Sequence, residues 1–88
     1  MLEREVRIIN PLGLHARAAA KLVRCSVRYK SSVTLARGVD TADAKSILSV
    51  LALAAGFGTL LNIKIDGPDE ADLMKEVAVL FLSGFGEI

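Results

Sequence analysis

Apolar and polar residues alternate with a period of two in several short stretches of the chain, which is the pattern of a half-buried β-strand. The alternation covers residues 3–9 and 60–66, and a third strand-like stretch occupies residues 32–36. An Arg-Gly pair at 37–38 predicts a tight turn, because glycine adopts positive φ without a steric cost. A short strand over 39–42 would complete a hairpin, so the pattern predicts four strands.

Three other stretches have helical spacing instead. They predict a first helix over 16–27, a short helix over 47–53 and a last helix over 70–83. Ser46 is a favourable N-cap for the short helix, and Gly84 supplies a stop for the last one. The order β-α-β-β-α-β-α predicts an α+β fold in which the helices cover one face of a single sheet.

The first helix is expected to have two faces of opposite character. Small and apolar residues at steps of four, three and four form the face expected to pack on the core: Ala16, Ala20, Val23 and Val27. Cations at the same steps form the second face: Arg17, Lys21, Arg24 and Arg28. A solvated helix face usually mixes both signs, yet no acidic residue occurs between positions 10 and 39. We interpret this cationic stripe as a docking surface for acidic partners, with a merely solvated face as the alternative.

The two later helices also have candidate inner and outer faces. The inner face expected for the last helix consists of Leu73, Met74, Val77, Ala78, Leu80 and Phe81. In the short helix, Leu48 and Leu51 are candidates for an apolar contact with a partner. One of these two leucines is expected in the core instead, because large apolar side chains are mostly buried.

Composition restricts the class of protein. The 88 residues are 52% hydrophobic, which is enough for one domain (residues 1–88), and the net charge of +1 gives no strong attraction to nucleic acid. With one cysteine, Cys25, and one histidine, neither an internal disulfide nor a zinc site is expected. The N-terminus is too charged for a signal peptide, and the apolar run over 47–55 is too short to span a bilayer. We therefore expect a cytoplasmic protein without membrane insertion.

The only histidine lies where the first strand pattern gives way to the first helix pattern. His15 follows a chain break at 10–13, and the helix start places it beside unpaired backbone N–H groups and the positive end of the helix dipole. That field favours a neutral, nucleophilic ring, and the N–H groups of Ala16 and Arg17 can hold an anion bonded to it. Arg17 adds a planar fork of donors that matches phosphate oxygens. These residues predict a site that carries a phosphoryl group on a ring nitrogen.

A histidine at a helix start is more often an ordinary cap or surface residue, and that alternative has to be weighed. Arg17 favours function, because a cation in the first turn opposes the helix dipole at a cost of roughly a few tenths of a kcal/mol. A residue that lowers the stability of the fold without an evident gain elsewhere is a candidate for a functional role.

Two motifs give the chain a resemblance to the HPr family of phosphocarrier proteins. Residues 13–19, Gly-Leu-His-Ala-Arg-Ala-Ala, are similar to the family's active-site motif Gly-Leu-His-x-Arg-Pro-Ala, with Ala18 in place of the usual proline. Residues 44–48, Ala-Lys-Ser-Ile-Leu, are similar to the segment around the family's regulatory serine. The end of the chain, 80–87, resembles the nitrogen-branch paralogue NPr more than HPr of the sugar phosphotransferase system. The resemblance extends over essentially the whole chain.

The resemblance implies a four-stranded antiparallel sheet with three helices on one face, the open-faced β-sandwich of this family. It implies that His15 takes a phosphoryl group on Nδ1 from phosphorylated enzyme I and passes it to an enzyme IIA, with Arg17 beside it. The chain would then be a carrier without a cofactor rather than an independent enzyme, and we expect a monomer. Ser46 becomes a candidate for phosphorylation by HPr kinase/phosphorylase, with a plain helix cap as the alternative.

Two other functions remain open from the residues. One is a regulatory binding module in which His15 is vestigial and Ser46 or surface charge decides the choice of partner. The other is a ferredoxin-like protein that binds RNA or a metabolite, since the element order is related. RNA binding predicts exposed aromatic residues on the strands, and the stretches 32–36 and 60–66 contain none. This last function is the least favoured.

Overall fold

The strands and helices follow one another in the order that the sequence pattern predicts, and a 3₁₀ turn is added at the end. The computed structural model describes residues 1–88. Its elements are β1 (Leu2–Arg7), α1 (Ala16–Ser26), β2 (Ser32–Arg37), β3 (Asp40–Asp43), α2 (Ile47–Ala52), β4 (Leu60–Asp66), α3 (Glu70–Leu82) and the 3₁₀ turn η1 (Gly84–Gly86). The observed bounds of β4 are the predicted ones, and those of the other elements differ from the prediction by at most two residues, which is the usual error at element ends.

The sheet is antiparallel throughout, and its order β1-β4-β2-β3 places β4 and β2 in the interior. Alternate residues of β4 are completely buried: Leu61, Ile63 and Ile65. The residues between them are at least partly exposed, with Lys64 and Asp66 in solvent. A shift of one residue would bring the polar set into the core, so this alternation fixes the register of β4.

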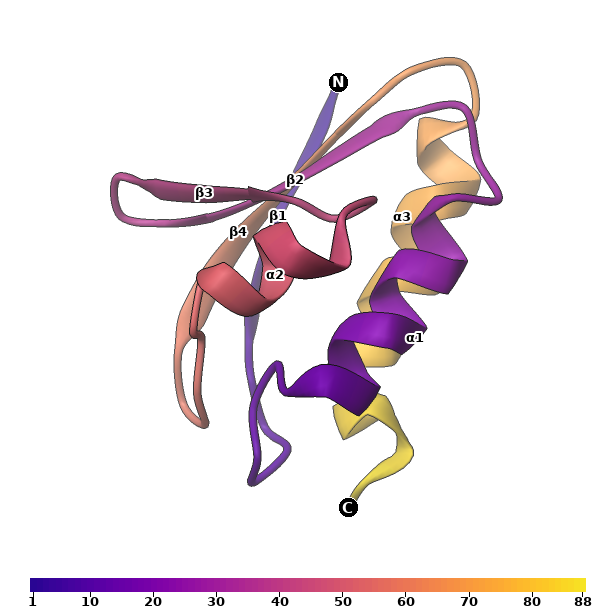
Figure 1. The fold of residues 1–88 in the computed structure, drawn as a ribbon. Helices are drawn as coiled ribbons and strands as arrows, with labels where there is room; N and C mark the ends of the chain where they lie inside the picture. The colour runs from indigo at the N-terminus through magenta and orange to yellow at the C-terminus, as the bar shows by residue number, and fades with distance from the viewer.

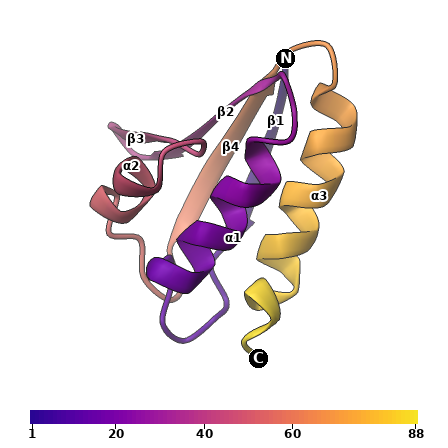
Figure 2. The same cartoon turned by 45° about the vertical axis from the view of Figure 1, so that its right-hand side comes forward.

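The three helices lie on the same face of the sheet, so the predicted open-faced arrangement is confirmed (Figures 1 and 2). In Figure 2, α1 lies between α2 on one side and α3 on the other. The N-terminal half of the chain contributes α1 and the C-terminal half contributes α3, yet the two helices run side by side. None of the helices combines the length and the apolar character needed to cross a membrane.

The face of α1 that packs on the core is not the predicted one. The buried residues are Ala18, Ala19, Leu22, Cys25 and Ser26, whereas Ala16 and Val27 are exposed and Ala20 and Val23 are only partly buried. The buried row starts two positions later than the predicted row, a rotation of about 200° around the helix. Alanines on both sides of the helix made the two rows look alike. The large side chain of Leu22, with no cation in its row, is what selects the buried side.

The expectation that Leu48 or Leu51 belongs to the core was wrong for both residues. Leu48 is 77% exposed and Leu51 is 36% exposed, while Val50 and Leu53 are buried instead. The helix has only six residues, so it buries a single narrow face, and residues two positions apart point in nearly opposite directions. Both leucines are therefore available on the surface.

The inner face of α3 agrees with the prediction. Leu73, Met74, Val77, Ala78 and Phe81 are buried, and Leu80 is partly buried against the same core. The turn predicted after β2 is also present: Gly38 has a φ of +60° and β3 begins at Asp40, one residue later than expected. Val39 falls in the turn itself and is 97% exposed.

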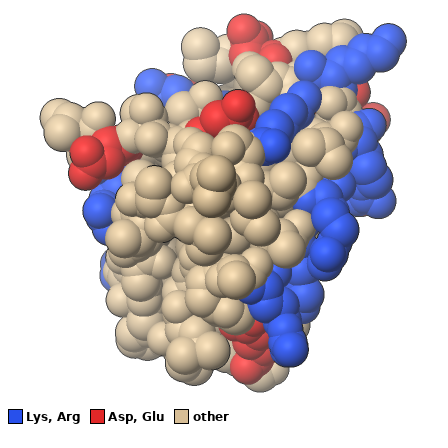
Figure 3. All heavy atoms as spheres, in the orientation of Figure 1, with Lys and Arg blue, Asp and Glu red and all other residues tan.

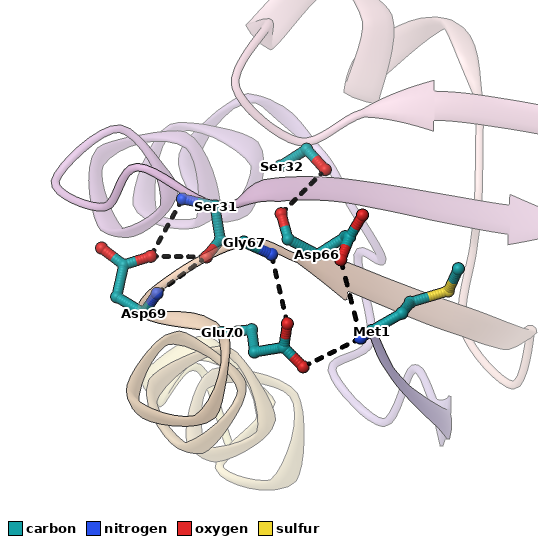
Figure 4. Close-up of polar contacts among 7 residues, drawn as sticks. All are labelled: Met1, Ser31, Ser32, Asp66, Gly67, Asp69 and Glu70. Carbon is teal, nitrogen blue, oxygen red and sulfur yellow. Dashed lines mark hydrogen bonds and ion pairs between the residues drawn. The ribbon is translucent and has the colours of Figure 1, made fainter.

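The start of α3 is joined to the segment before β2 through one carboxylate (Figure 4). Asp69, at the N-cap of α3, makes no capping bond within its own helix. It accepts hydrogen bonds from the Ser31 hydroxyl and from the backbone N–H groups of Lys30 and Ser31, the latter two at 2.9 Å. The hydrogen bond from the Ser31 hydroxyl, followed by that from the Lys30 N–H, lowers the pKa of Asp69 to about 2.

The N-terminal amino group closes the same end of the molecule. The ammonium of Met1 lies 3.1 Å from a carboxylate oxygen of Glu70 and 3.6 Å from one of Asp66 (Figure 4). The hydrogen bond to Glu70 raises the pKa of this amino group. These contacts hold the edge strand β1 against the end of β4 and the first turn of α3.

We expect Asp69→Asn to lower the free energy of unfolding at neutral pH and to remove part of the loss of stability in acid. The folded-state pKa, about 2, is below the ordinary value of 3.8, so the stabilisation by this carboxylate is full above that ordinary value and is lost as the pH falls toward 2. Urea unfolding followed by circular dichroism at several pH values measures the effect. The unfolding free energies of the two proteins should converge in acid.

Asp72→Asn is the matched control, because it removes an exposed carboxylate from the first turn of the same helix. A difference between wild type and Asp69→Asn that stays constant down to a pH of about 2 would contradict this account of Asp69.

Candidate functional site

The loop between β1 and α1 is held by the side chain of Asn10. This residue is 1% exposed, and its amide nitrogen donates to the carbonyl of Gly13 at 2.7 Å. Gly13 has a φ of +67°, and a Cβ there would lie 2.6 Å from the carbonyl oxygen of Ala55. The following N–H, that of Leu14, donates to the same carbonyl at 2.9 Å. The chain break predicted at 10–13 is thus a closely packed turn that requires glycine.

His15 is the N-cap of α1, as its position in the sequence predicts. Its backbone is extended (φ −75°, ψ −179°), and its carbonyl accepts the first helical hydrogen bond, from Ala19 at 2.8 Å. No side chain caps this end of the helix, and its first turn contains no acidic residue. The N–H groups of Ala16, Arg17 and Ala18 therefore have no partner inside the helix. Together with the helix dipole they attract an anion to the histidine.

The C-terminal end of the chain brings a carboxylate to the histidine ring. The sequence pattern did not predict this contact. Glu87 Oε2 lies 2.6 Å from His15 Nε2, and Glu87 Oε1 accepts a hydrogen bond from the Asn10 amide at 3.0 Å. Burial by itself raises the pKa of Glu87, but the hydrogen bonds from Asn10 and His15 outweigh it and leave this pKa lowered. A carboxylate can only accept, so Nε2 carries the ring proton and Nδ1 of the neutral ring keeps its lone pair.

An uncommon backbone conformation places Glu87. Three successive residues at 84–86 have positive φ, of +59°, +56° and +73°, and the middle one, Phe85, adopts it at a steric cost. Its ring is 1% exposed and packs edge-to-face on Phe81 with the centroids 5.0 Å apart, and Lys21 Nζ donates to its carbonyl at 2.6 Å. Burial of an aromatic ring offsets the strain. The sequence signal for this turn was the Gly-Phe-Gly-Glu run after the helix stop.

A cleft borders the histidine ring, and both predicted catalytic residues line it. Its walls are formed by Pro11, Leu12, His15, Ala16, Arg17, Lys21, Gly86 and Glu87. Arg17 is exposed on the first turn of α1. Arg17 and Lys21 contribute two cationic side chains to the walls of the cleft. Nowhere in the chain do three or more histidine, cysteine, aspartate or glutamate side chains converge as metal ligands would.

The structure distributes the predicted docking residues over both sides of α1. The cations after Arg17 line a groove between α1 and α3: Lys21, Arg24 and Arg28. Figure 3 shows lysine and arginine atoms gathered along the edge of the molecule where α1 and α3 lie. The exposed leucines of α2, Leu48 and Leu51, belong to the helix on the other side of α1. In Figure 3, the surface over α2 is almost free of charged atoms.

Ser46 caps α2, as predicted. Its hydroxyl oxygen accepts from the N–H of Ser49 at 3.3 Å, and its own N–H donates to the carbonyl of Asp43 at 3.0 Å. The side chain is half-buried and is not among the residues that line the His15 cleft. The two candidate modification sites therefore have separate surroundings.

Comparison with known proteins identifies the family. Residues 2–82 match a family model described as the PTS HPr component phosphorylation site. The phosphocarrier protein HPr of Cupriavidus necator is 46% identical over 87 residues, covering 99% of this chain and 98% of that protein. The protein of the same name from Xylella fastidiosa (strain Temecula1) is 45% identical with the same coverage. The chain belongs to the HPr family.

Solved HPr structures have the same fold. The crystal structure of HPr-C-His from Thermoanaerobacter tengcongensis matches with a TM-score of 0.96 and 32% identity, covering 100% of this chain and 99% of that chain. A structure of an HPr dimer from the same organism matches with a TM-score of 0.79 and 32% identity, covering 99% and 100%. HPr is a phosphocarrier, an intermediary in group transfer within the phosphotransferase system. In this chain, the contact with Glu87 occupies Nε2 of His15 and leaves Nδ1 as the other ring nitrogen.

We expect Glu87→Gln to release His15 from a single tautomer. The carboxylate holds the ring proton on Nε2, whereas an amide can turn either its NH₂ group or its carbonyl toward the ring and loses that preference. ¹⁵N NMR of the ring at alkaline pH distinguishes the protonated nitrogen from the unprotonated one. The wild type should show one protonated nitrogen, Nε2, and the variant a mixture. Glu3→Gln, on the surface of β1, is the control, and unchanged ring signals in Glu87→Gln would refute this role of Glu87.

Proposed function

We propose that His15 accepts a phosphoryl group on Nδ1 from phosphorylated enzyme I and passes it to an enzyme IIA. The protein would act as a monomeric carrier in the cytoplasm. No cofactor takes part, because the reaction exchanges one N–P bond for another. The observation that supports this proposal most is the 2.6 Å contact between Nε2 and Glu87, which leaves Nδ1 as the free nucleophile at the start of α1.

The residues around the ring can each be given a part in the transfer. The lone pair of Nδ1 attacks phosphorus and forms a new N–P bond, while the bond to the donor histidine breaks and the donor nitrogen keeps the electron pair. The proton on Nε2 stays in place, so the ring gains positive charge that the carboxylate of Glu87 stabilises. The phosphoryl oxygens face the guanidinium of Arg17 and the backbone N–H groups of Ala16 and Arg17. The backbone N–H groups are held by the helix before the reaction, so they need little reorganisation.

Docking of the partner enzymes is proposed to use the surface that surrounds this cleft. Arg24 and Arg28 continue the row of cations that begins at Arg17, and such a row attracts acidic surfaces and raises the rate of association. Leu48 and Leu51 supply apolar contacts from α2. Both leucines lie outside the core, so a partner can cover them without any change in the fold.

Ser46 is proposed as a regulatory site, with HPr kinase/phosphorylase as the enzyme that modifies it. A phosphate at the N-cap of α2 would suit the local helix end and would add negative charge to the surface that docks acidic partners. Phosphorylation should therefore weaken association with enzyme I and leave the fold intact.

A regulatory binding module without phosphoryl transfer is the second candidate, since the 77% exposure of Leu48 suits partner docking with or without transfer. The two functions differ in one experiment, since only a carrier takes phosphate from enzyme I.

Incubation with enzyme I and phosphoenolpyruvate should add one acid-labile phosphoryl group to this chain. The chain has one histidine, so His15→Ala should abolish the addition completely. Intact-protein mass spectrometry before and after mild acid treatment measures the label. Acid-labile phosphate on His15→Ala would disprove the assignment, and an unlabelled wild type would support the regulatory module instead.

Arg24→Glu and Ser46→Asp should both reduce the rate of phosphorylation by enzyme I, mainly through slower association. The rate in the wild type should fall steeply with salt over the range in which the Debye length shrinks from about 10 Å to about 3 Å. Aspartate is a good N-cap and Arg24 is exposed, so circular dichroism should show folded protein in both variants. Steady-state transfer at low and high salt is the measurement.

The control for the charge reversal is Lys64→Glu, which makes the same change on the exposed face of β4. If neither Arg24→Glu nor Ser46→Asp slows transfer at low salt, the cationic stripe is only a solvated face and Ser46 only a cap.

A further inference from the structure

The groove between α1 and α3 is the largest hollow on the molecule, and the proposed phosphoryl transfer does not use its α3 side. It encloses about 770 Å³. Its lining residues are Lys21, Arg24, Cys25, Val27 and Arg28 from α1 and the segment after it, and Lys75, Glu76, Val79 and Leu80 from α3. On each helix they recur at steps of three and four, so the groove runs along both helix axes. From Lys21 to Arg28 it extends for about two helical turns, or about 10 Å.

The rim of this groove has an excess of positive charge. It carries four cations and one carboxylate, that of Glu76. Glu76 is already engaged within the chain, because Arg28 lies 3.2 Å from its Oε1 and the Tyr29 hydroxyl donates to its Oε2. Lys21 donates to the carbonyl of Phe85. Arg24 on one wall and Lys75 on the other are exposed and remain to bind an anionic partner.

The floor of the groove is apolar. Cys25 is buried at 6% exposure and Leu80 is partly buried, so neither offers a polar group to a ligand. Val27 is 55% exposed and Val79 is 61% exposed, and on the next turn of α3 Leu82 is also 61% exposed. Val27 and Val79 line the groove, whereas Leu82 lies beyond it on α3. Water covers such exposed apolar side chains at a cost in free energy.

We propose that the α1–α3 groove docks an acidic amphipathic helix of a partner protein. The apolar floor of the groove, between the walls formed by α1 and α3, fits the apolar face of a third helix. The apolar residues of such a helix recur at positions i, i+3, i+4 and i+7. Cations on both walls complement glutamate or aspartate on the flanks of that helix, so the charges select an acidic helix over a basic one.

This surface shares Arg24 and Arg28 with the one proposed for the transfer enzymes, but it extends onto α3, where Lys75 and Val79 lie outside the His15 cleft. The groove adjoins that cleft at Lys21, which lines both. A helix in the groove would therefore lie beside the carrier histidine without covering it. A flat anionic membrane is a poorer occupant, because the apolar residues line a recess between two helices.

The probe is a synthetic helical peptide of about fifteen residues, with leucines at i, i+4 and i+7 on one face, glutamates flanking them and alanines elsewhere. Titration into the ¹⁵N-labelled chain, followed by NMR, should give saturable shifts confined to the amides of α1 and α3 along the groove. Lys75→Glu and Val79→Asp should each raise the dissociation constant at least tenfold, about 1.4 kcal/mol. Lys64→Glu, the same charge reversal on the exposed face of β4, should leave it unchanged.

Both α3 variants change exposed side chains, so they should fold, which circular dichroism checks. At high salt, where long-range charge is screened, they should also be phosphorylated by enzyme I at the wild-type rate, which separates the α3 wall from the proposed transfer function. Lack of saturable binding, equal binding to Lys75→Glu, or shifts centred on α2 would each overturn the proposal. Sedimentation of the chain with phosphatidylglycerol vesicles, lost in Lys75→Glu while the peptide fails to bind, would replace the helix by a membrane and overturn it as well.

Discussion

The amide of Asn10 joins the beginning and the end of the chain at the proposed phosphoryl site, and the geometry of that site depends on it. Its two hydrogens go to the carbonyl of Gly13 and to the carboxylate of Glu87. Both partners are acceptors, so the NH₂ group has to face them, and the amide oxygen is left buried without a partner. One buried side chain thus fixes both the loop before His15 and the carboxylate behind it.

The site combines two groups that come from opposite ends of the sequence. The start of α1 supplies backbone N–H groups and a dipole, which favour an anion on one side of the ring. Glu87 supplies a fixed acceptor on the other side and thereby decides which nitrogen is free. Neither group alone defines a carrier histidine, because a helix start without Glu87 leaves the tautomer open. The strained turn at 84–86, held by the ring of Phe85, is what brings the second group into place.

The single sign of charge on α1 is explained by its neighbours in space. Acidic residues are absent from the sequence around this helix, but α3 supplies Glu76 to Arg28, and η1 supplies the Phe85 carbonyl to Lys21. Part of the cationic stripe is thus satisfied within the fold, and part remains for partners. The positions that remain are Arg17 at the His15 cleft and Arg24 in the groove toward α3. The side of α1 toward α2 offers exposed leucines instead of cations.

The sequence by itself determined the order of the elements, the alternation of buried and exposed residues in β4, the caps at His15 and Ser46 and the family, because each depends on local periodicity or on a short motif. Periodicity also identified the inner face of α3, where large apolar residues lie on one side only. It failed for α1, where alanines on both sides make the faces equivalent until Leu22 packs against the sheet, and for α2, where six residues bury only Val50. His15 and Arg17 could be predicted as site residues from their neighbours in the chain. Glu87 could not, because it lies 72 positions from His15 and only the packing of α3 on α1 brings the two side chains together.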